Sequence, residues 1–161
     1  MNIEINTNVA ALDGVLCYSN DEHSFRFDVG SPADLASRVG PGGATSIAIG
    51  TLQVEVAVAT RRALFAWGLH PRGRWRVEHM DLPRAQEGEV LFDASVHLVP
   101  GVTVTAAPVG QWATKFDPDS GWVRVEADSD ADDMEVKIAE GVIVGGRDGA
   151  LHSLWLHPIF D

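Results

Sequence analysis

Two stretches of the chain, each ending in Leu-His-Pro, carry nearly the same order of residue types. They are Val56–Pro71 (VAVATRRALFAWGLHP) and Val142–Pro158 (VIVGGRDGALHSLWLHP). In each, alternating apolar residues flank a short polar turn, which is the pattern of a β-hairpin. We therefore expect the chain to be built around two hairpins. The repeat also raises the alternative of two similar halves, although two short matches can arise by chance in a chain rich in Val, Ala, Gly and Leu.

Short alternating segments separated by turn residues continue along most of the chain. Gly14–Val29 predicts a further hairpin, and Ile47–Ala59 has the longest strand pattern, with a frame shift at Gly50 that predicts a β-bulge. Ala150–His157 is apolar on both faces, which is typical of a central strand. We therefore expect one all-β domain over residues 1–161, an antiparallel β-sandwich or barrel of about 10–12 short strands.

One segment, residues 31–39, has the pattern of a short helix. Ser31 suits the N-cap, Pro32 suits the first helical position, and Asp34 completes a capping box. Gly40 is the expected stop. A helix of about nine residues is not stable alone in water, so this helix is expected to dock on a sheet.

The net charge of −11 is large for 161 residues. It argues against a nucleic-acid partner, because such binding needs a basic surface. The charge is also uneven: residues 61–84 hold six Arg against two acids, and residues 116–161 hold eleven acids against three bases. The single cysteine, Cys17, fits a reducing compartment, and no stretch resembles a membrane span or signal peptide. A soluble cytoplasmic protein is the expectation.

Motifs that carry chemistry are missing from the sequence. There is no Gly-x-Ser-x-Gly, His-Glu-x-x-His, cysteine pair or phosphate-binding loop, so we expect no cofactor and assign no catalytic residues. His70 and His157 hold equivalent places in the two hairpins, but no third ligand accompanies them and no metal site is expected. We interpret them as bonding backbone carbonyls at strand ends, and His79 as a core residue beside Trp75.

Two further patterns suggest chemistry that their geometry opposes. Asp93, Ser95 and His97 alternate along the expected strand Val90–Val99, but residues two apart on a strand are ~6.6–7 Å apart, too far for a nucleophile and its base. We expect them to be a solvated face.

The segment Arg72–Arg76 mixes arginines with Trp75, as proteins that bind single-stranded nucleic acids do. Strand alternation turns this tryptophan away from the arginines and opposes that function.

The acidic stretch Asp128-x-Asp130-x-Asp132 resembles the opening of an EF-hand calcium loop. Asp133 stands where that loop has glycine, and Ala139 stands where it has glutamate. Weak calcium binding is therefore the alternative, and a solvated acidic loop is the expectation.

Our preferred hypothesis is a non-catalytic protein that binds a basic protein partner through an acidic face. A toxin-neutralising, immunity-type protein is one version of it. Trp122 is expected to face outward with Arg124 and Glu126, and an exposed tryptophan is a typical contact residue. The predicted contact face lies in the loops 117–119 and 126–135 and consists of Trp122, Asp117, Asp119, Glu126, Asp128, Asp130, Asp132 and Asp133.

Two alternatives belong to other functional classes. The first is a small-molecule site lined by His and Trp residues, with or without enzymatic turnover, which a concave apolar pocket with converging polar groups would favour. The second is a structural subunit whose hairpins pair edge to edge in a homo-oligomer. A stable oligomer in light scattering would favour the second. No membrane partner is expected.

Overall fold

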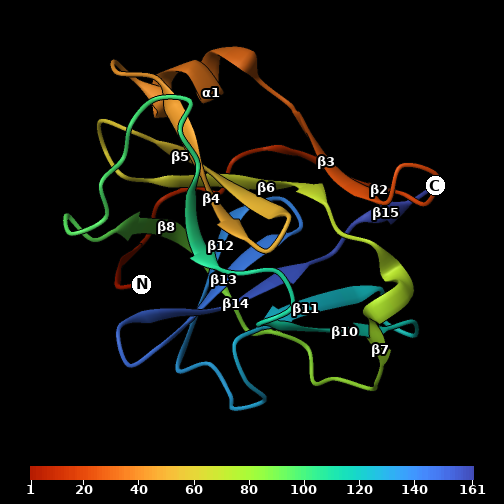
Figure 1. The fold of residues 1–161 in the computed structure, drawn as a ribbon. Coiled ribbons are helices and arrows are strands. Elements are labelled where there is room, and N and C mark those ends of the chain that lie inside the picture. The colour runs from red at the N-terminus through yellow and green to blue at the C-terminus, as the bar shows by residue number, and fades with distance from the viewer.

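The computed structural model describes residues 1–161 and places them in two β-sheets packed on each other (Figure 1). One sheet has eight strands, in the order β1 (Ile3–Thr7), β8 (Gln86–Phe92), β12 (Met134–Ala139), β13 (Val142–Arg147), β14 (Ala150–Leu156), β11 (Trp122–Glu126), β10 (Ala113–Asp117) and β7 (Arg76–Val77). The other has seven, in the order β15 (Ile159–Phe160), β2 (Gly14–Ser19), β3 (Ser24–Val29), β6 (Ala63–Leu69), β5 (Leu52–Ala57), β4 (Ala44–Ile49) and β9 (Val104–Ala107). The predicted all-β sandwich is confirmed.

The two similar stretches form hairpins at the centres of the two sheets. The first folds as β5–β6 and the second as β13–β14, both antiparallel. Strand β6 lies between β3 and β5, and β14 lies between β13 and β11. Every residue of β14 after Ala150 is buried, which confirms the prediction of a central strand covered on both faces. Whether the two hairpins descend from one ancestral segment stays a prediction.

The predicted helix is confirmed as α1 (Pro32–Val39). The Ser31 hydroxyl accepts a hydrogen bond from the backbone N–H of Asp34 at 3.1 Å, as the capping pattern predicts. Gly40 ends the helix with a φ of +62°, which glycine adopts without the steric cost that a side chain brings. Figure 1 shows the helix outside the seven-stranded sheet, beyond β5.

The prediction of one long strand over Ile47–Ala59 is wrong. The segment contains the end of β4 and all of β5, which pair antiparallel with Ile47 opposite Val54 and Ile49 opposite Leu52. The frame shift at Gly50 marks a hairpin turn instead of a bulge. Gly50 has a φ of +61°, and a two-residue turn of this kind requires a positive φ.

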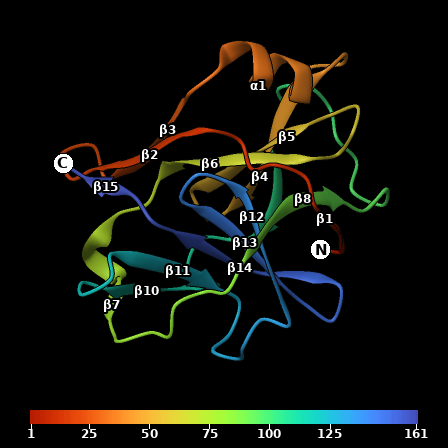
Figure 2. The same ribbon diagram turned by 180° about the vertical axis from the view of Figure 1, so that it is seen from behind.

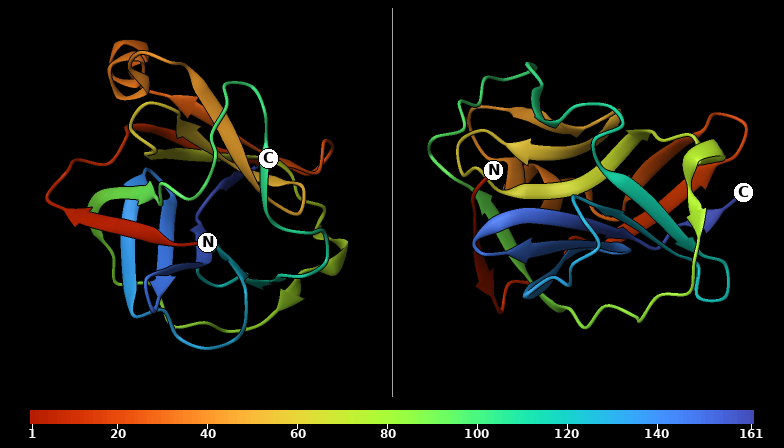
Figure 3. Two further views of the ribbon diagram at one scale, coloured as in Figure 1. Left: turned by 60° about the vertical axis from the view of Figure 1, so that its left-hand side comes forward. Right: turned by 60° about the horizontal axis from the view of Figure 1, so that its bottom comes forward.

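The pairing is mixed rather than wholly antiparallel, and the strands number fifteen instead of about 10–12. Four of the thirteen strand pairs are parallel: β7–β10, β8–β12, β15–β2 and β4–β9. These four pairs join segments far apart in sequence, which local alternation does not reveal. Figures 2 and 3 show the two layers from other sides, with β1 running beside β8.

A core of 25 buried residues fills the space between the sheets. It includes Leu16 and Val56 from the seven-stranded sheet and Val136 and Leu154 from the eight-stranded sheet. Burying an aliphatic side chain of this size contributes about 1.5–3 kcal/mol to folding, so this shared core holds the two layers together. No helix of the structure is long and apolar enough to cross a membrane.

Loops cover the outer face of the eight-stranded sheet, which strand alternation predicts to be solvated. A second apolar cluster lies there, formed by Met80, Ile143 and Trp155 with Ala85 and Trp122 packed against it.

The cover explains why one prediction is wrong. Arg124 and Glu126 were expected to face solvent, but they are 7% and 2% exposed. Alternation shows that their side chains lie on the face of the strand opposite the core. It does not show what lies above them.

Two further predicted strands are shorter than expected. The segment Val90–Val99 leaves the sheet after Phe92, and Ser95 folds back to donate a hydrogen bond to Asp93 at 2.5 Å. The expectation that these two side chains stand apart on a strand is therefore wrong, although both residues are exposed. The segment Arg74–Met80 contributes only the two residues of β7, after a 3₁₀ turn at Arg72–Arg74.

His79 lies beyond this short strand with its side chain 81% exposed, so its prediction as a core residue is also wrong.

Candidate functional site

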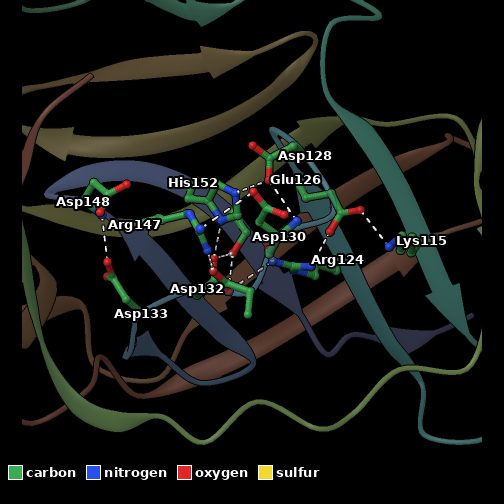
Figure 4. Close-up of polar contacts among 12 residues, drawn as sticks. Lys115, Arg124, Glu126, Asp128, Asp130, Asp132, Asp133, Arg147, Asp148 and His152 are labelled. Atoms are coloured by element: carbon green, nitrogen blue, oxygen red, sulfur yellow. Dashed lines mark hydrogen bonds and ion pairs between the residues drawn. The ribbon is translucent and has the colours of Figure 1, made fainter.

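Polar groups gather in two regions of the molecule. The first, here called the ionic cluster, lies on the outer face of the eight-stranded sheet beneath the loop 127–133 (Figure 4). It consists of Lys115, Arg124, Glu126, Asp128, Asp130, Asp132, Arg147 and His152. The second, here called the cleft, is a cavity of about 710 Å³ that residues from both sheets line.

The carboxylate of Asp132 is the centre of the ionic cluster. Its side chain is fully buried, and the Nη2 atom of Arg124 lies 3.5 Å from it. His152 bonds one oxygen through Nδ1 at 2.7 Å, Ser153 donates to both oxygens at 2.8 Å, and the Trp155 indole donates at 3.0 Å. A buried carboxylate with this many donors is satisfied within the protein.

A β-bulge brings both His152 and Ser153 to the same carboxylate. Successive residues of a strand normally point to opposite faces. Here the pairing of β13 with β14 shifts between Gly145 and Gly146, which leaves His152 as an extra, unpaired residue. A bulge of this kind reorients side chains, and in Figure 4 the histidine turns toward the loop that carries Asp128 and Asp132.

Glycine at position 145 makes room for the Asp132 carboxylate. A Cβ atom at this position would lie 2.5 Å from the Oδ1 atom of Asp132, closer than such atoms approach. The two neighbouring glycines of β13 therefore have separate uses: one makes room for the carboxylate and the other takes part in the bulge.

His152 is held between two carboxylates. Its Nε2 atom lies 2.8 Å from Asp128, and its Nδ1 atom bonds Asp132 on the other side. A histidine that donates from both ring nitrogens carries a positive charge. Burial alone lowers the pKa of His152, but the hydrogen bonds to Asp132 and Asp128 outweigh burial and raise it above its usual value. The same contact with His152 lowers the pKa of Asp128.

Charges balance across the cluster. It contains four carboxylates and three permanent cations, so it is neutral only when His152 is protonated. Glu126 pairs with Lys115 at 2.9 Å and with Arg124. The Arg124 guanidinium also lies over the Trp155 ring, 5.1 Å from its centre. The cluster thus ties the 127–133 loop to the sheet with almost every charge paired.

The structure divides the predicted contact face into a buried part and an exposed part. Asp117, Glu126 and the side chain of Asp132 are buried and bond groups within the protein. Their placement on a contact surface is therefore wrong: loops cover the sheet face to which Asp117 and Glu126 belong, and the Asp132 side chain is buried beneath its own loop. The exposed acids of the set are Asp119, Asp128, Asp130 and Asp133.

Trp122 is half-buried rather than free on the surface. Its ring stacks on His157 at 4.7 Å between centroids and meets Trp155 edge to face at 6.2 Å. His157 in turn bonds the backbone carbonyl of Ser120 at 3.0 Å, as predicted for a histidine at a strand end.

Asp117, Asp119 and His79 bring one potential ligand atom each to within 4.8 Å of one another. The Asp117 oxygens, however, accept hydrogen bonds from the backbone N–H groups of Met80 and Asp119, both at 3.0 Å. The N–H of Met80 is the main reason that the pKa of Asp117 lies below its usual value. The arrangement is that of a hydrogen-bonded turn.

The cleft is lined by residues from both sheets and from the segments that connect them. One wall is the turn after β4, and the other includes Thr114 of β10 and Val125 of β11. None of the lining residues is acidic: they are Ile49, Gly50, Thr51, Leu69, His70, Pro71, Gly73, Arg74, Trp75, Arg76, Pro108, Val109, Gly110, Trp112, Ala113, Thr114 and Val125. The volume lies within the range of about 300–1,000 Å³ that is common for ligand sites.

Three hydrogen bonds hold His70 in the cleft. Its backbone N–H bonds the His23 carbonyl at 2.7 Å, and its own carbonyl accepts from the Tyr18 hydroxyl at 2.8 Å. The ring Nε2 lies 2.8 Å from the Thr114 hydroxyl, not from a carbonyl as predicted. Burial lowers the pKa of His70 to about 4. The ring is therefore neutral at pH 7, and its Nδ1 atom has no partner in the protein.

Arg74 and Arg76 are the charged residues of the cleft. The Arg74 guanidinium extends to the opposite segment, where a Cβ added to Gly110 would lie 3.8 Å from its Nη1 atom. Neither arginine has an ion pair. Glu78, the nearest acid in sequence, lies 3.8 Å from Lys115.

Trp75 forms part of the cleft wall between these arginines, with its indole N–H buried and unpaired. The Arg72 guanidinium lies 5.4 Å from the centre of its ring, so the prediction that alternation turns Trp75 away from the arginines is wrong.

Sequence patterns gave signals for parts of both regions, but they did not show how the residues are arranged in space. The Gly145-Gly146 pair within a strand was the available signal for a bulge beside His152. The local excess of arginine over residues 61–84 was the signal for the basic cleft. Trp112 and Thr114 carried no signal, because they reach the cleft through non-local packing. Comparison with protein-family models and with curated proteins finds no match.

Proposed function

We propose that the protein binds a small organic molecule in the cleft. The observation that supports this proposal is a cavity of about 710 Å³ with apolar walls and a few converging polar groups, which is the usual form of a small-molecule site. Trp112 offers a flat apolar surface, and His70 offers a free ring nitrogen. Trp75 also lines the cavity, although its ring packs against Tyr18 and Phe25. This arrangement favours the small-molecule hypothesis over the other two that the sequence suggests.

The cleft and the ionic cluster differ in whether their polar groups already have partners within the protein. In the ionic cluster nearly every donor already has a protein acceptor, so a ligand would have to displace an internal bond. In the cleft the neutral His70 ring and the two arginines have unused hydrogen-bonding capacity. A ligand there gains contacts without breaking any.

Binding of the neutral dye N-phenyl-1-naphthylamine tests the proposal. The dye brightens in apolar surroundings, so a saturable rise in fluorescence reports entry into the cleft. Replacing Trp112 by Ala removes one wall and should weaken binding roughly tenfold, the size of effect seen at a central aromatic contact. Trp122→Ala is the matched control, because Trp122 is also half-buried but does not line the cleft.

The two tryptophan variants separate the outcomes. Loss of binding in Trp112→Ala with retention in Trp122→Ala supports the cleft as the site. Equal effects of the two variants would overturn the proposal, and so would the absence of saturable binding by both this neutral dye and its sulfonated analogue. Urea unfolding of both variants checks that they are folded under the conditions of the binding assay.

We propose as a second candidate that the exposed acids bind a basic protein partner, which includes the toxin-neutralising version. Asp119 is exposed in the turn before β11, and Asp128, Asp130 and Asp133 are exposed in the loop after it. Trp122, the first residue of β11, is partly accessible. Mixing with a panel of basic proteins at low and high salt tests this function, because exposed charges are screened by salt. A complex that salt does not weaken, or that survives neutralising Asp119, Asp130 and Asp133 to Asn together, would count against it.

A further inference from the structure

The arginines of the cleft indicate what kind of molecule it takes. The chain carries 23 acidic residues against 12 lysines and arginines, so acids outnumber basic residues almost two to one. Five of the ten arginines pair with a carboxylate, among them Arg26 with Asp28, Arg38 with Asp34 and Arg62 with Glu89. Arg74 and Arg76 line a cavity that contains no acidic residue.

The position of Arg74 makes its charge available inside the cleft. Its guanidinium lies near Gly110, on the segment that forms the opposite wall. Gly110 has a φ of +83°, where side chains are disfavoured, so this approach stays open. A guanidinium binds planar anions such as carboxylates with two parallel hydrogen bonds, and it binds sulfonate or phosphate oxygens as well.

The neutral groups of the cleft limit the rest of the ligand. Trp112 provides an aromatic face and Trp75 a further part of the apolar wall. The neutral ring of His70 and the Thr114 hydroxyl provide hydrogen bonds without charge. The lining has no carboxylate that would pair with a cation. An overall charge of −11 repels anions from most of the surface, so the two arginines supply the local attraction that an anion needs.

We infer that the cleft selects an organic anion: a molecule with a flat apolar body and one acidic head group, which Arg74 and Arg76 bind. This inference rests on the proposed function of the cleft and adds the charge of the ligand. The apolar body would lie against the two tryptophans, and the head group would lie toward the mouth, where the arginines are exposed.

Two dyes with nearly the same rings test the inference. One is 8-anilinonaphthalene-1-sulfonate, and the other is the neutral N-phenyl-1-naphthylamine, which lacks the sulfonate. The anionic dye should bind the wild-type protein at least about tenfold more tightly, since hydrogen bonds to charged groups are the stronger ones. In the double variant Arg74→Gln with Arg76→Gln, the anionic dye should lose about tenfold or more in affinity and the neutral dye less than about twofold.

Arg84→Gln is the matched control. Arg84 also lacks an ion pair, but it does not line the cleft, so its neutralisation should leave both dyes unchanged. All three arginines are on the surface or at its edge, and their replacement is compatible with folding.

The outcomes separate this inference from the proposal on which it rests. If the neutral dye binds as tightly as the anionic one, or if the double variant weakens both equally, the cleft binds apolar molecules and the selectivity for anions is overturned. If neither dye binds, or if Trp112→Ala leaves the binding of both unchanged, the proposed function is overturned together with the inference.

Discussion

The ionic cluster and the cleft differ in how completely their charges are paired. In the cluster, Asp132 receives hydrogen bonds from His152, Ser153 and Trp155, and an ion pair joins it to Arg124. In the cleft, Arg74 and Arg76 have no carboxylate and no acid lines the cavity. The first region gathers eight charged or ionisable residues, yet it offers almost nothing to a ligand.

The difference shows that residue type is a weaker guide to function than the state of each group's partners. Buried charges cost several kcal/mol unless they are paired, so a dense cluster of charges inside a fold is first a structural requirement. A charge left unpaired at the rim of a cavity has no such structural use. Substitutions in the ionic cluster and in the cleft test this difference, and the largest effect is expected in the cluster.

Replacing Asp132 by Ala should destabilise the protein by about 3–5 kcal/mol, because it leaves buried cationic groups without their partner. Urea unfolding measures the change. Asp130→Ala is the matched control in the same loop, since the Asp130 carboxylate is exposed and lies 3.8 Å from Arg147; its effect should stay within about 1 kcal/mol. Equal costs for the two variants would show that the cluster is not a buried structural unit.

The two regions should respond to pH in opposite directions through His70 and His152. The pKa of His70 falls to about 4 in the fold. Its contribution to the free energy of unfolding is therefore fully present above the unfolded pKa of about 6.5. That contribution, about 3 kcal/mol, is lost as the pH falls toward 4. The pKa of His152 is raised. Its contribution to the free energy of unfolding is therefore present below about pH 6.5 and is lost as the pH rises through the pKa of His152 in the folded protein.

The two opposite pH dependences can be measured as free energies of unfolding between about pH 4 and pH 8. The proteins compared are the wild type, His70→Gln and His152→Gln. The stability difference between wild type and His70→Gln should shrink as pH falls. The difference between wild type and His152→Gln should shrink as pH rises. Differences that change with pH in the same direction would contradict the opposite protonation states of the two histidines.

Gly145→Ala should cost about 1–3 kcal/mol, because the added methyl group meets the Ser153 hydroxyl and the Asp132 carboxylate in a space already filled. Gly73→Ala is the control: a Cβ there meets nothing within 4 Å, so the change should be within about 0.5 kcal/mol. Thermal unfolding compares them. A tolerated alanine at position 145 would mean that the Asp132 loop is free to move.

The smallest stability effect is expected in the cleft. Arg76→Gln should change the free energy of unfolding by no more than about 0.5 kcal/mol, since the side chain is exposed and unpaired. Arg124→Gln removes a buried partner of Glu126 and Asp132 and should cost about 3 kcal/mol or more. A comparable loss at Arg76 would indicate a structural contact and weaken its assignment to ligand binding.

Much of the fold could be predicted from local patterns. The hairpins, the capped helix and the central strand β14 each depend on residues close in sequence. The alternation of Val123 and Val125 also identified the core face of β11 correctly. Local patterns failed at Gly50, where a hairpin turn was interpreted as a bulge, and after Phe92, where the strand ends. A second kind of failure was non-local: alternation separates the two faces of a strand but does not show whether a loop covers the outer one. Glu126 and Arg124 were misplaced for that reason.

The functional regions were less predictable than the fold. His152 was not linked to Asp128 and Asp132, because the link depends on a bulge and on a loop that folds back over the sheet. The cleft depends on the approach of the segments 70–76 and 108–114. These segments are far apart in sequence, and no spacing rule connects them.

The central position of the two hairpins has a consequence for how the chain folds. Strands β5 and β6, like β13 and β14, are joined by short turns and can pair within microseconds. The partners at the sheet edges come from distant segments, as in the pairing of β1 with β8, and closing such long loops is slow. We therefore expect each layer to grow outward from its hairpin, so the last contacts to form, and the first to be lost on unfolding, are those at the sheet edges.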